Sequence, residues 1–133
     1  MATNSFCGRK GLPAIVLSTL LPVISGCSGA SPNPPAGLLT SAAAQRAGGE
    51  LFAANCAICH GSHGDGHGRR QESMVPPPAN LTVPPWSARA NAARTFLAIR
   101  GGVPGTAMAA WPMLSEEEIW QLVAYIETLQ EGR

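Results

Sequence analysis

Charged and aromatic residues are both scarce in this sequence. Charged residues make up 13% of the 133 positions and aromatic residues 5%, and Lys10 is the only lysine. A protein that binds nucleic acid presents a clustered basic surface, so this composition argues against a nucleic-acid partner. A small domain with so few large side chains buries little apolar surface of its own. The composition therefore favours one domain that gains apolar mass from a bound cofactor.

Cysteine is also scarce, and its spacing does not indicate a disulfide framework. Cys7 and Cys27 lie near the N-terminus, whereas Cys56 and Cys59 are close neighbours inside the chain. Disulfide-rich domains instead distribute paired cysteines over their whole length. The two groups of cysteines therefore need separate explanations.

Residues 1–26 have the layout of a secretory signal peptide. Arg9 and Lys10 precede an apolar stretch at 12–24, which is short for a membrane span of about 20 apolar residues. The ISGC sequence at 24–27 resembles the bacterial lipobox, in which signal peptidase cuts before a lipidated cysteine. This resemblance implies an exported protein on the periplasmic side of a bacterial membrane, anchored in the lipid through Cys27. An uncleaved anchoring helix is the alternative.

The remainder of the chain divides into a tether and a folded domain. Residues 27–39, CSGASPNPPAGLL, are rich in Ser, Pro and Gly and lack hydrophobic periodicity. This composition predicts a tether that holds the domain at 40–133 away from the membrane.

Helices account for all of the regular structure that the domain sequence predicts. Thr40 or Ser41 is expected to cap a helix that ends near Asn55. In the third helix, Ser115 and Glu118 form a capping box ahead of apolar residues at helical spacing. No stretch shows the alternation of a β-strand, so the predicted fold class is all-α, with long loops that wrap a cofactor.

A short helix at 91–100 is expected between these two, stopped by Gly101 and Gly102. The positions expected to be buried in it are Ala92, Phe96, Leu97 and Ile99.

The second cysteine pair belongs to the sequence Cys56-Ala57-Ile58-Cys59-His60. Cys-x-x-Cys-His is the attachment signature of c-type haem. The spacing lets two thiols reach two neighbouring vinyl groups from a single turn, and the histidine that follows binds the iron. The motif therefore predicts one covalent haem c, attached through Cys56 and Cys59 and ligated by His60.

Two other sites use similar residues. A thioredoxin-like dithiol lies at a helix N-terminus in a βαβ setting, whereas this pair follows a helix in a chain without predicted strands. A tetrahedral zinc site needs four ligands, for which Cys56, Cys59, His63 and His67 are available. Such a site leaves His60 without a role.

Met108 lies in the sequence GGVPGTAMAAW at 101–111. This stretch closely resembles the Gly-Thr-x-Met-Pro-x-Trp ligand loop of class I bacterial cytochrome c domains, with Gly105, Thr106, Met108 and Trp111 at the matching positions. The resemblance implies that Met108 is the second axial ligand of the iron and that Gly105 and Trp111 support the haem pocket. Ala109 replaces the family's proline, so a less stiff loop and a more labile iron–sulfur bond are expected.

Met113 is the reserve ligand, and we expect it to pack in the core.

The resemblance extends from about residue 48 to residue 129. Gly48 and Phe52 match the family's N-terminal helix, and Leu122, Tyr125 and Ile126 match the C-terminal helix that crosses it. Gly48 is then expected to allow a close crossing of the two helices.

The Asn80-Leu81 pair matches a Pro-Asn-Leu turn of the same family, with Ala79 at the position of the proline. By analogy, the Ala79 carbonyl accepts a hydrogen bond from His60 and so fixes the orientation of the imidazole. Leu81 packs either on the haem ring or in the ordinary core.

The resemblance implies an electron carrier, not an enzyme, that passes single electrons between a redox protein donor and an acceptor. From residue 27 onward, seven arginines against eight acidic residues leave a formal charge of −1, which predicts weak electrostatic steering. A fixed subunit of a larger respiratory or dehydrogenase complex is a second interpretation. A haem protein with a labile Met108, active as a peroxidase or gas sensor, is a third.

Overall fold

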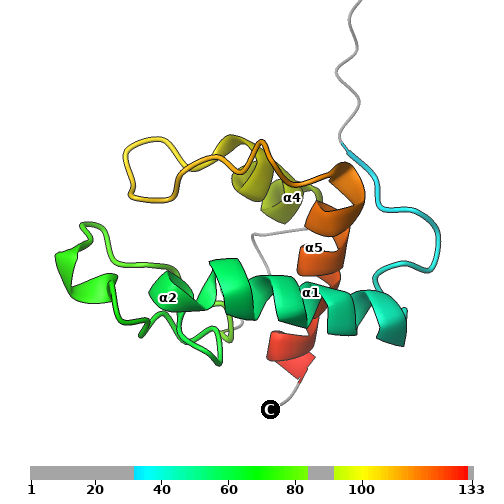
Figure 1. Cartoon of the computed structure of the whole chain (residues 1–133), viewed down its shortest axis with the longest axis horizontal. Coiled ribbons are helices and arrows are strands. Elements are labelled where there is room, and N and C mark those ends of the chain that lie inside the picture. The colour runs from blue at the N-terminus through cyan, green and yellow to red at the C-terminus, as the bar shows by residue number, and fades with distance from the viewer. Residues whose placement is uncertain (1–31, 84–91, 132–133) are drawn as a thin grey trace, which may run out of the picture.

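The computed structural model describes residues 32–83 and 92–131, and this part of the chain is helical without any strand (Figure 1). The predicted all-α class is therefore confirmed. The signal peptide at 1–26 and Cys27 lie outside the described residues. No helix in the described ranges is long and apolar enough to cross a membrane. The elements are α1 (Ala42–Asn55), α2 (Ala57–His60), the short 3-10 helix η1 (Gln71–Ser73), α4 (Ala92–Gly101) and α5 (Glu116–Glu131).

The two long helices begin at the caps that the sequence predicts. The Ala44 N–H donates to Ser41 Oγ over 3.4 Å at the start of α1. At the start of α5, the Glu118 N–H donates to Ser115 Oγ over 3.2 Å, and the Ser115 N–H donates to Glu118 Oε2 over 2.7 Å. These hydrogen bonds satisfy N–H groups that have no partner within the helix.

Helices α1 and α5 cross in close contact, and Gly48 makes this contact possible. A Cβ built on Gly48 would overlap the backbone carbonyl of Gln121 and lie 2.9 Å from the Cβ of Tyr125. One turn further along α1, the rings of Phe52 and Tyr125 lie 5.2 Å apart. The predicted close crossing at Gly48 is confirmed.

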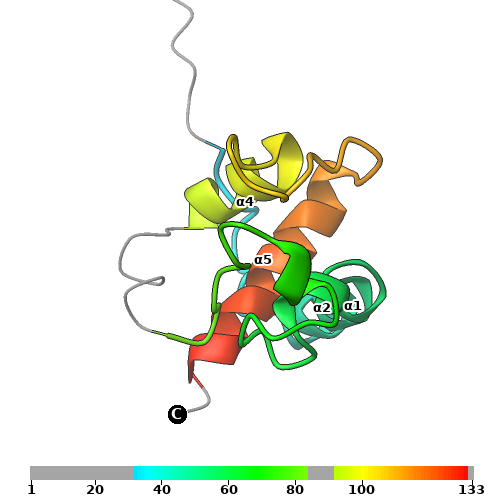
Figure 2. The ribbon, with the colours of Figure 1, turned by 90° about the vertical axis from the view of Figure 1, so that its left-hand side faces the viewer.

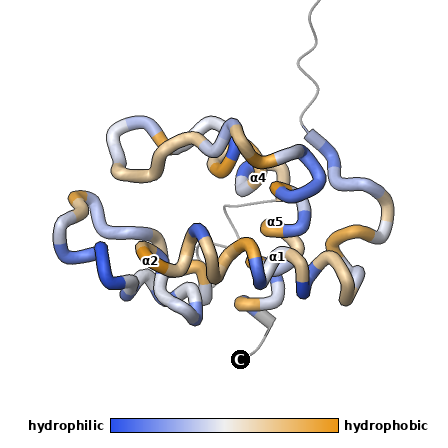
Figure 3. Tube along the Cα trace, viewed as in Figure 1, coloured by the Kyte–Doolittle hydropathy of each residue, from blue (hydrophilic) through white to orange (hydrophobic). Residues whose placement is uncertain are grey.

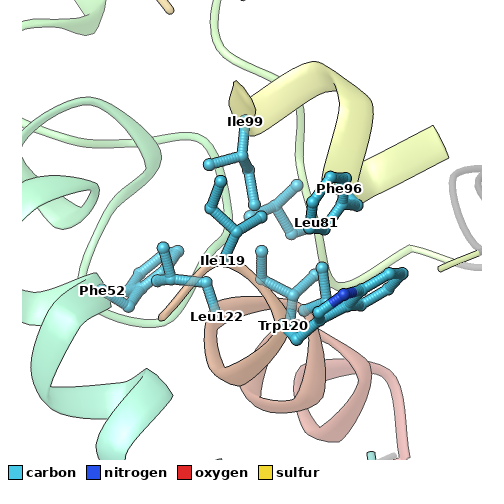
Figure 4. Packing of buried hydrophobic residues seen from close by; sticks show 9 residues of the cluster. Phe52, Leu81, Phe96, Ile99, Ile119, Trp120 and Leu122 are labelled. Atoms are coloured by element: carbon cyan, nitrogen blue, oxygen red, sulfur yellow. The ribbon is translucent and has the colours of Figure 1, made fainter. Parts of the chain in front are cut away.

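The core lies where α5 meets α1 on one side and α4 on the other (Figure 4). Trp120 of α5 packs against Phe96 of α4, with ring centroids 4.4 Å apart. The expectation for α4 is confirmed for Phe96 and Ile99 but wrong for Leu97, whose side chain is 52% exposed. A short helix that packs on one face buries only one stripe of its apolar residues.

The predicted tether ends closer to the core than its composition suggests. Leu38 and Leu39, its last two residues, pack against the core cluster. The Gln45 side-chain amide donates to the Leu39 carbonyl over 3.0 Å and so fastens this segment to α1. The packed domain therefore begins before Thr40.

Candidate functional site

The Cys-x-x-Cys-His sequence forms a single helical turn at the end of α1. The Cys56 N–H donates to the Phe52 carbonyl over 2.8 Å, which ends α1. The Cys56 carbonyl then accepts from the N–H groups of Cys59 and His60, over 3.1 and 2.9 Å. Both thiols are free and partly buried. The turn thus holds two thiols and an imidazole on one segment. This segment directly follows α1, the helix that crosses α5.

A glycine-rich loop at 61–70 is hydrogen-bonded to the backbone of this turn. The N–H groups of Gly66, Gly68 and Arg70 donate to the carbonyls of His60, Cys59 and Ile58, over 2.8 to 3.0 Å. A Cβ on Gly68 would overlap the backbone of Cys59, so only glycine allows this approach. The sequence predicts long loops between the helices but not this contact between the loop and the turn. Its signal is the glycine at every second position from 64 to 68.

The His60 imidazole is oriented by the loop that contains Ala79. His60 Nδ1 lies 3.1 Å from the Ala79 carbonyl oxygen, to which it donates, and this is the hydrogen bond that the family resemblance implies. The carbonyl is held in place because the Leu81 N–H donates to the Gly64 carbonyl over 2.7 Å. Leu81 itself is 4% exposed and belongs to the core cluster.

The protonation state of His60 suits a metal ligand. Burial lowers the pKa of His60, and the Ala79 carbonyl opposes this shift only in part. The neutral ring donates through Nδ1, which leaves the lone pair on Nε2 available for a metal.

The electrostatics of the cysteine pair argue against a redox dithiol. Burial, with a smaller contribution from the neighbouring Cys59, raises the pKa of Cys56 to about 11. Reactive dithiols depend on the opposite shift, because the thiolate is the nucleophile. The burial of Cys56 instead favours the neutral thiol over the thiolate.

The arrangement also argues against a zinc site. Within residues 32–83 and 92–131, no group of three or more His, Cys, Asp or Glu side chains is placed to hold a metal ion. His67 instead pairs with Asp65, with Nδ1 and Oδ2 3.7 Å apart on an exposed part of the loop. The structure therefore does not gather the four candidate zinc ligands.

Met108 lies in the loop between α4 and α5, and hydrogen bonds hold its backbone on both sides. The Met108 N–H donates to Thr106 Oγ1 over 3.1 Å, and the Met108 carbonyl accepts from the Val103 N–H over 3.0 Å. Its side chain is partly buried and packs against the core cluster. Met113, expected to pack in the core, is 71% exposed, because it lies in the outward turn that precedes α5.

Gly105 and Trp111 shape the same loop. Gly105 has φ of +76° at the third position of a Val103–Thr106 turn, in which the Thr106 N–H donates to the Val103 carbonyl over 3.2 Å. Such a turn needs a positive φ at this position and therefore glycine. Trp111 is partly buried against the core cluster, and its backbone N–H donates to the Ile99 carbonyl over 3.1 Å.

The fold brings the two sequence motifs together. Cys56 and Ala57 from one motif, and Met108 and Trp111 from the other, all pack against the same core cluster. In Figure 1, α2 and the loop after α4 lie at the same, left-hand end of the molecule, the loop above α2, and in Figure 2 this end faces the viewer. Thiols, an oriented imidazole and a thioether around an apolar core are the donor set that fits haem c.

An all-α fold with a Cys-x-x-Cys-His turn at the end of its first helix is typical of c-type cytochromes. The profile of the family described as "Cytochrome C oxidase, cbb3-type, subunit III" matches residues 43–126, and the chain belongs to this family. It is a cytochrome c electron-transfer domain, and membership of this family implies covalently bound haem c.

Two similar proteins are both longer than this chain. The Cbb3-type cytochrome c oxidase subunit FixP of Azorhizobium caulinodans is 34% identical over 121 residues, which cover 88% of this chain and 36% of that subunit. A chain of the Kuenenia stuttgartiensis reducing HAO-like protein complex matches with a TM-score of 0.55 and 28% identity, over 64% of this chain and 42% of that one. The chain therefore spans less than half the length of each relative. The structural match confirms the expected cytochrome c fold.

Proposed function

We propose that this protein is a monohaem c-type cytochrome that carries single electrons outside the cytoplasm, anchored to the membrane through an acylated Cys27. Cys56 and Cys59 attach the haem, and His60 and Met108 are its axial ligands. The observation that carries this proposal is the convergence of Cys56 and Met108 on one core cluster, with His60 held by the Ala79 carbonyl over 3.1 Å. The bound haem supplies the one-electron chemistry, and the protein sets its potential and its docking.

Each ligand residue has a separate task. The two thiols fix the cofactor to the turn that α1 positions. The hydrogen bond from His60 Nδ1 to the Ala79 carbonyl keeps the imidazole in one orientation and raises its basicity as a ligand. Met108 would supply a thioether ligand to the bound haem, and such a ligand favours the reduced state of the iron and so raises the potential.

Replacing Met108 with alanine is expected to abolish the methionine-to-iron charge-transfer band of the oxidised protein. The reduced form is then expected to bind carbon monoxide rapidly, because an axial position has opened. The measurement is an absorption spectrum, before and after dithionite, of protein from a host that matures haem c. Met113→Ala is the matched control, since that side chain is 71% exposed. Loss of the band in Met113→Ala and not in Met108→Ala would reverse the assignment.

The rate of association with the redox partner is expected to depend little on salt. The loop between α4 and α5 contains no charged residue from 102 to 114, and in Figure 3 it shows no strongly hydrophilic segment. Val75 and Val103 are 92% and 37% exposed on the loops around α2 and Met108. We expect an apolar docking patch on the loop between α4 and α5, which gives little long-range steering.

We expect a change of no more than about threefold in the association rate between about 0.01 M and about 0.15 M ionic strength, where the Debye length shrinks from about 30 to about 8 Å. Stopped-flow mixing with the isolated partner measures this rate. A steep fall with salt would show that charges guide the encounter.

The relatives favour a second candidate, a permanent electron-transfer subunit of a respiratory complex. FixP is named as a subunit of an oxidase, and the structural relative belongs to a protein complex. The site chemistry is the same in both cases, and only the lifetime of the interface differs. Purification from membranes in mild detergent separates them, because a subunit elutes with its complex and a shuttle elutes alone.

A further inference from the structure

The loop that presents Met108 lacks the proline that the resembling family places directly after the ligand. Proline fixes its own φ and restricts the residue before it. With Ala109 at this position, another feature has to limit the motion of the Met108 backbone. The hydrogen bonds of the loop identify that feature.

The Thr106 hydroxyl acts as donor and acceptor within one turn. Its Oγ1 donates to the Val103 carbonyl over 2.8 Å and accepts from the Met108 N–H over 3.1 Å. Because the Val103 N–H donates to the Met108 carbonyl over 3.0 Å, Val103 and Met108 are joined both directly and through Thr106. Both backbone polar groups of Met108 are therefore held by this small ring of contacts.

A close backbone approach at Gly102 flanks this ring of hydrogen bonds. Gly102 has φ of +70°, and a Cβ built on it would lie 2.8 Å from both the Met108 carbonyl oxygen and the Ala110 nitrogen. The chain segments at 102–103 and 108–110 are thus in direct backbone contact. The Thr106 side chain is exposed and takes no part in the core, so its role is confined to this loop.

We propose that Thr106 is a positioning residue for the Met108 ligand, and that its hydroxyl limits how often the thioether leaves the iron in place of the missing proline. This inference rests on the proposed role of Met108 and adds the residue that regulates it. Ala109 leads us to expect a labile bond between Met108 and the iron. A Met108 backbone held by Thr106 instead favours electron transfer over a labile haem site.

The test compares Thr106→Val, which keeps the shape but removes both hydrogen bonds, with Thr106→Ser, which keeps both. In Thr106→Val we expect the rate of carbon monoxide binding to the reduced protein to rise about tenfold, as loss of one or two net hydrogen bonds predicts. The methionine charge-transfer band should weaken, and the Met108 amide proton should exchange faster with solvent. Thr106→Ser should stay within about twofold of the parent.

A third variant keeps the test independent of folding. Adding Ala109→Pro to Thr106→Val should restore slow carbon monoxide binding, because no backbone hydrogen bond of Ala109 occurs in the described loop. Far-UV circular dichroism at the assay temperature should match the parent in all variants, which shows that each variant is folded when carbon monoxide binding is measured.

The inference is overturned if Thr106→Val binds carbon monoxide at the parental rate while Met108→Ala binds it fast. A parent protein without the charge-transfer band would instead remove the proposed ligand, and the inference with it.

Discussion

A protein in which Cys56 and Cys59 are both serine is expected to carry no covalently attached pigment. The two thiols lie on one helical turn, and Cys56 is held there by the hydrogen bond from its backbone N–H to the Phe52 carbonyl, which ends α1. From residue 28 to the end of the chain the sequence contains no other cysteine, so no substitute thiol is available. A serine hydroxyl does not form the thioether, and the Cys-x-x-Cys-His signature depends on it.

The measurement is haem staining of the denatured protein, together with its mass and with extraction by acid acetone. The parent should retain its pigment through extraction and the double variant should have none. Cys27→Ser is the control, because it removes a cysteine that lies outside the haem motif. Pigment that acid acetone extracts from the parent would contradict covalent attachment and the function that depends on it.

Features encoded within a few residues were predictable from the sequence. The capping box of Ser115 and Glu118 is local, and both of its hydrogen bonds form. The Cys-x-x-Cys-His turn is local as well, since its helical hydrogen bonds run from Cys59 and His60 to Cys56. The resemblance to a family added two contacts between distant segments, at Gly48 and at Ala79, that no local pattern contains.

Features set by packing were not predictable in the same way. Leu97 and Met113 are large and apolar, but they are 52% and 71% exposed because the described fold places nothing over them. Leu38 and Leu39 look like the end of a tether, but in the folded chain they are partly buried and pack against the core cluster. Apolar character alone does not say which residues are covered.

Replacing Gly48 with alanine is expected to destabilise the domain severely, although alanine is the better helix former. Helix propensity alone favours the substitution by about 1 kcal/mol. Against it, the new Cβ overlaps the Gln121 carbonyl and lies 2.9 Å from the Tyr125 Cβ. Neither atom belongs to the flexible end of a side chain, so relief requires α1 and α5 to separate. Overpacking of this kind costs about 3 kcal/mol, a large part of the 5 to 15 kcal/mol that stabilises a typical domain.

Gly101→Ala is the matched control for this experiment. Gly101 ends α4, and nothing lies within 4 Å of a Cβ built on it. This variant should therefore be as stable as the parent or slightly more stable, by less than about 1 kcal/mol. Urea denaturation of the haem-loaded proteins measures both changes. Equal midpoints for Gly48→Ala and the parent would show that α1 and α5 can accommodate the added methyl group without loss of stability.

The Gly48 variant should also affect the site, because the crossing and the haem motif share one helix. Cys56 directly follows the last residue of α1, and Phe52, whose ring lies 5.2 Å from that of Tyr125, precedes it by one turn. A helix forced away from α5 at Gly48 carries this turn with it, whereas Met108 stays on its own loop. We therefore expect Gly48→Ala to weaken the methionine charge-transfer band even in the fraction that remains folded. An unchanged band in that fraction would mean that the loop at 102–114 follows α1, and that the two halves of the site move as one body.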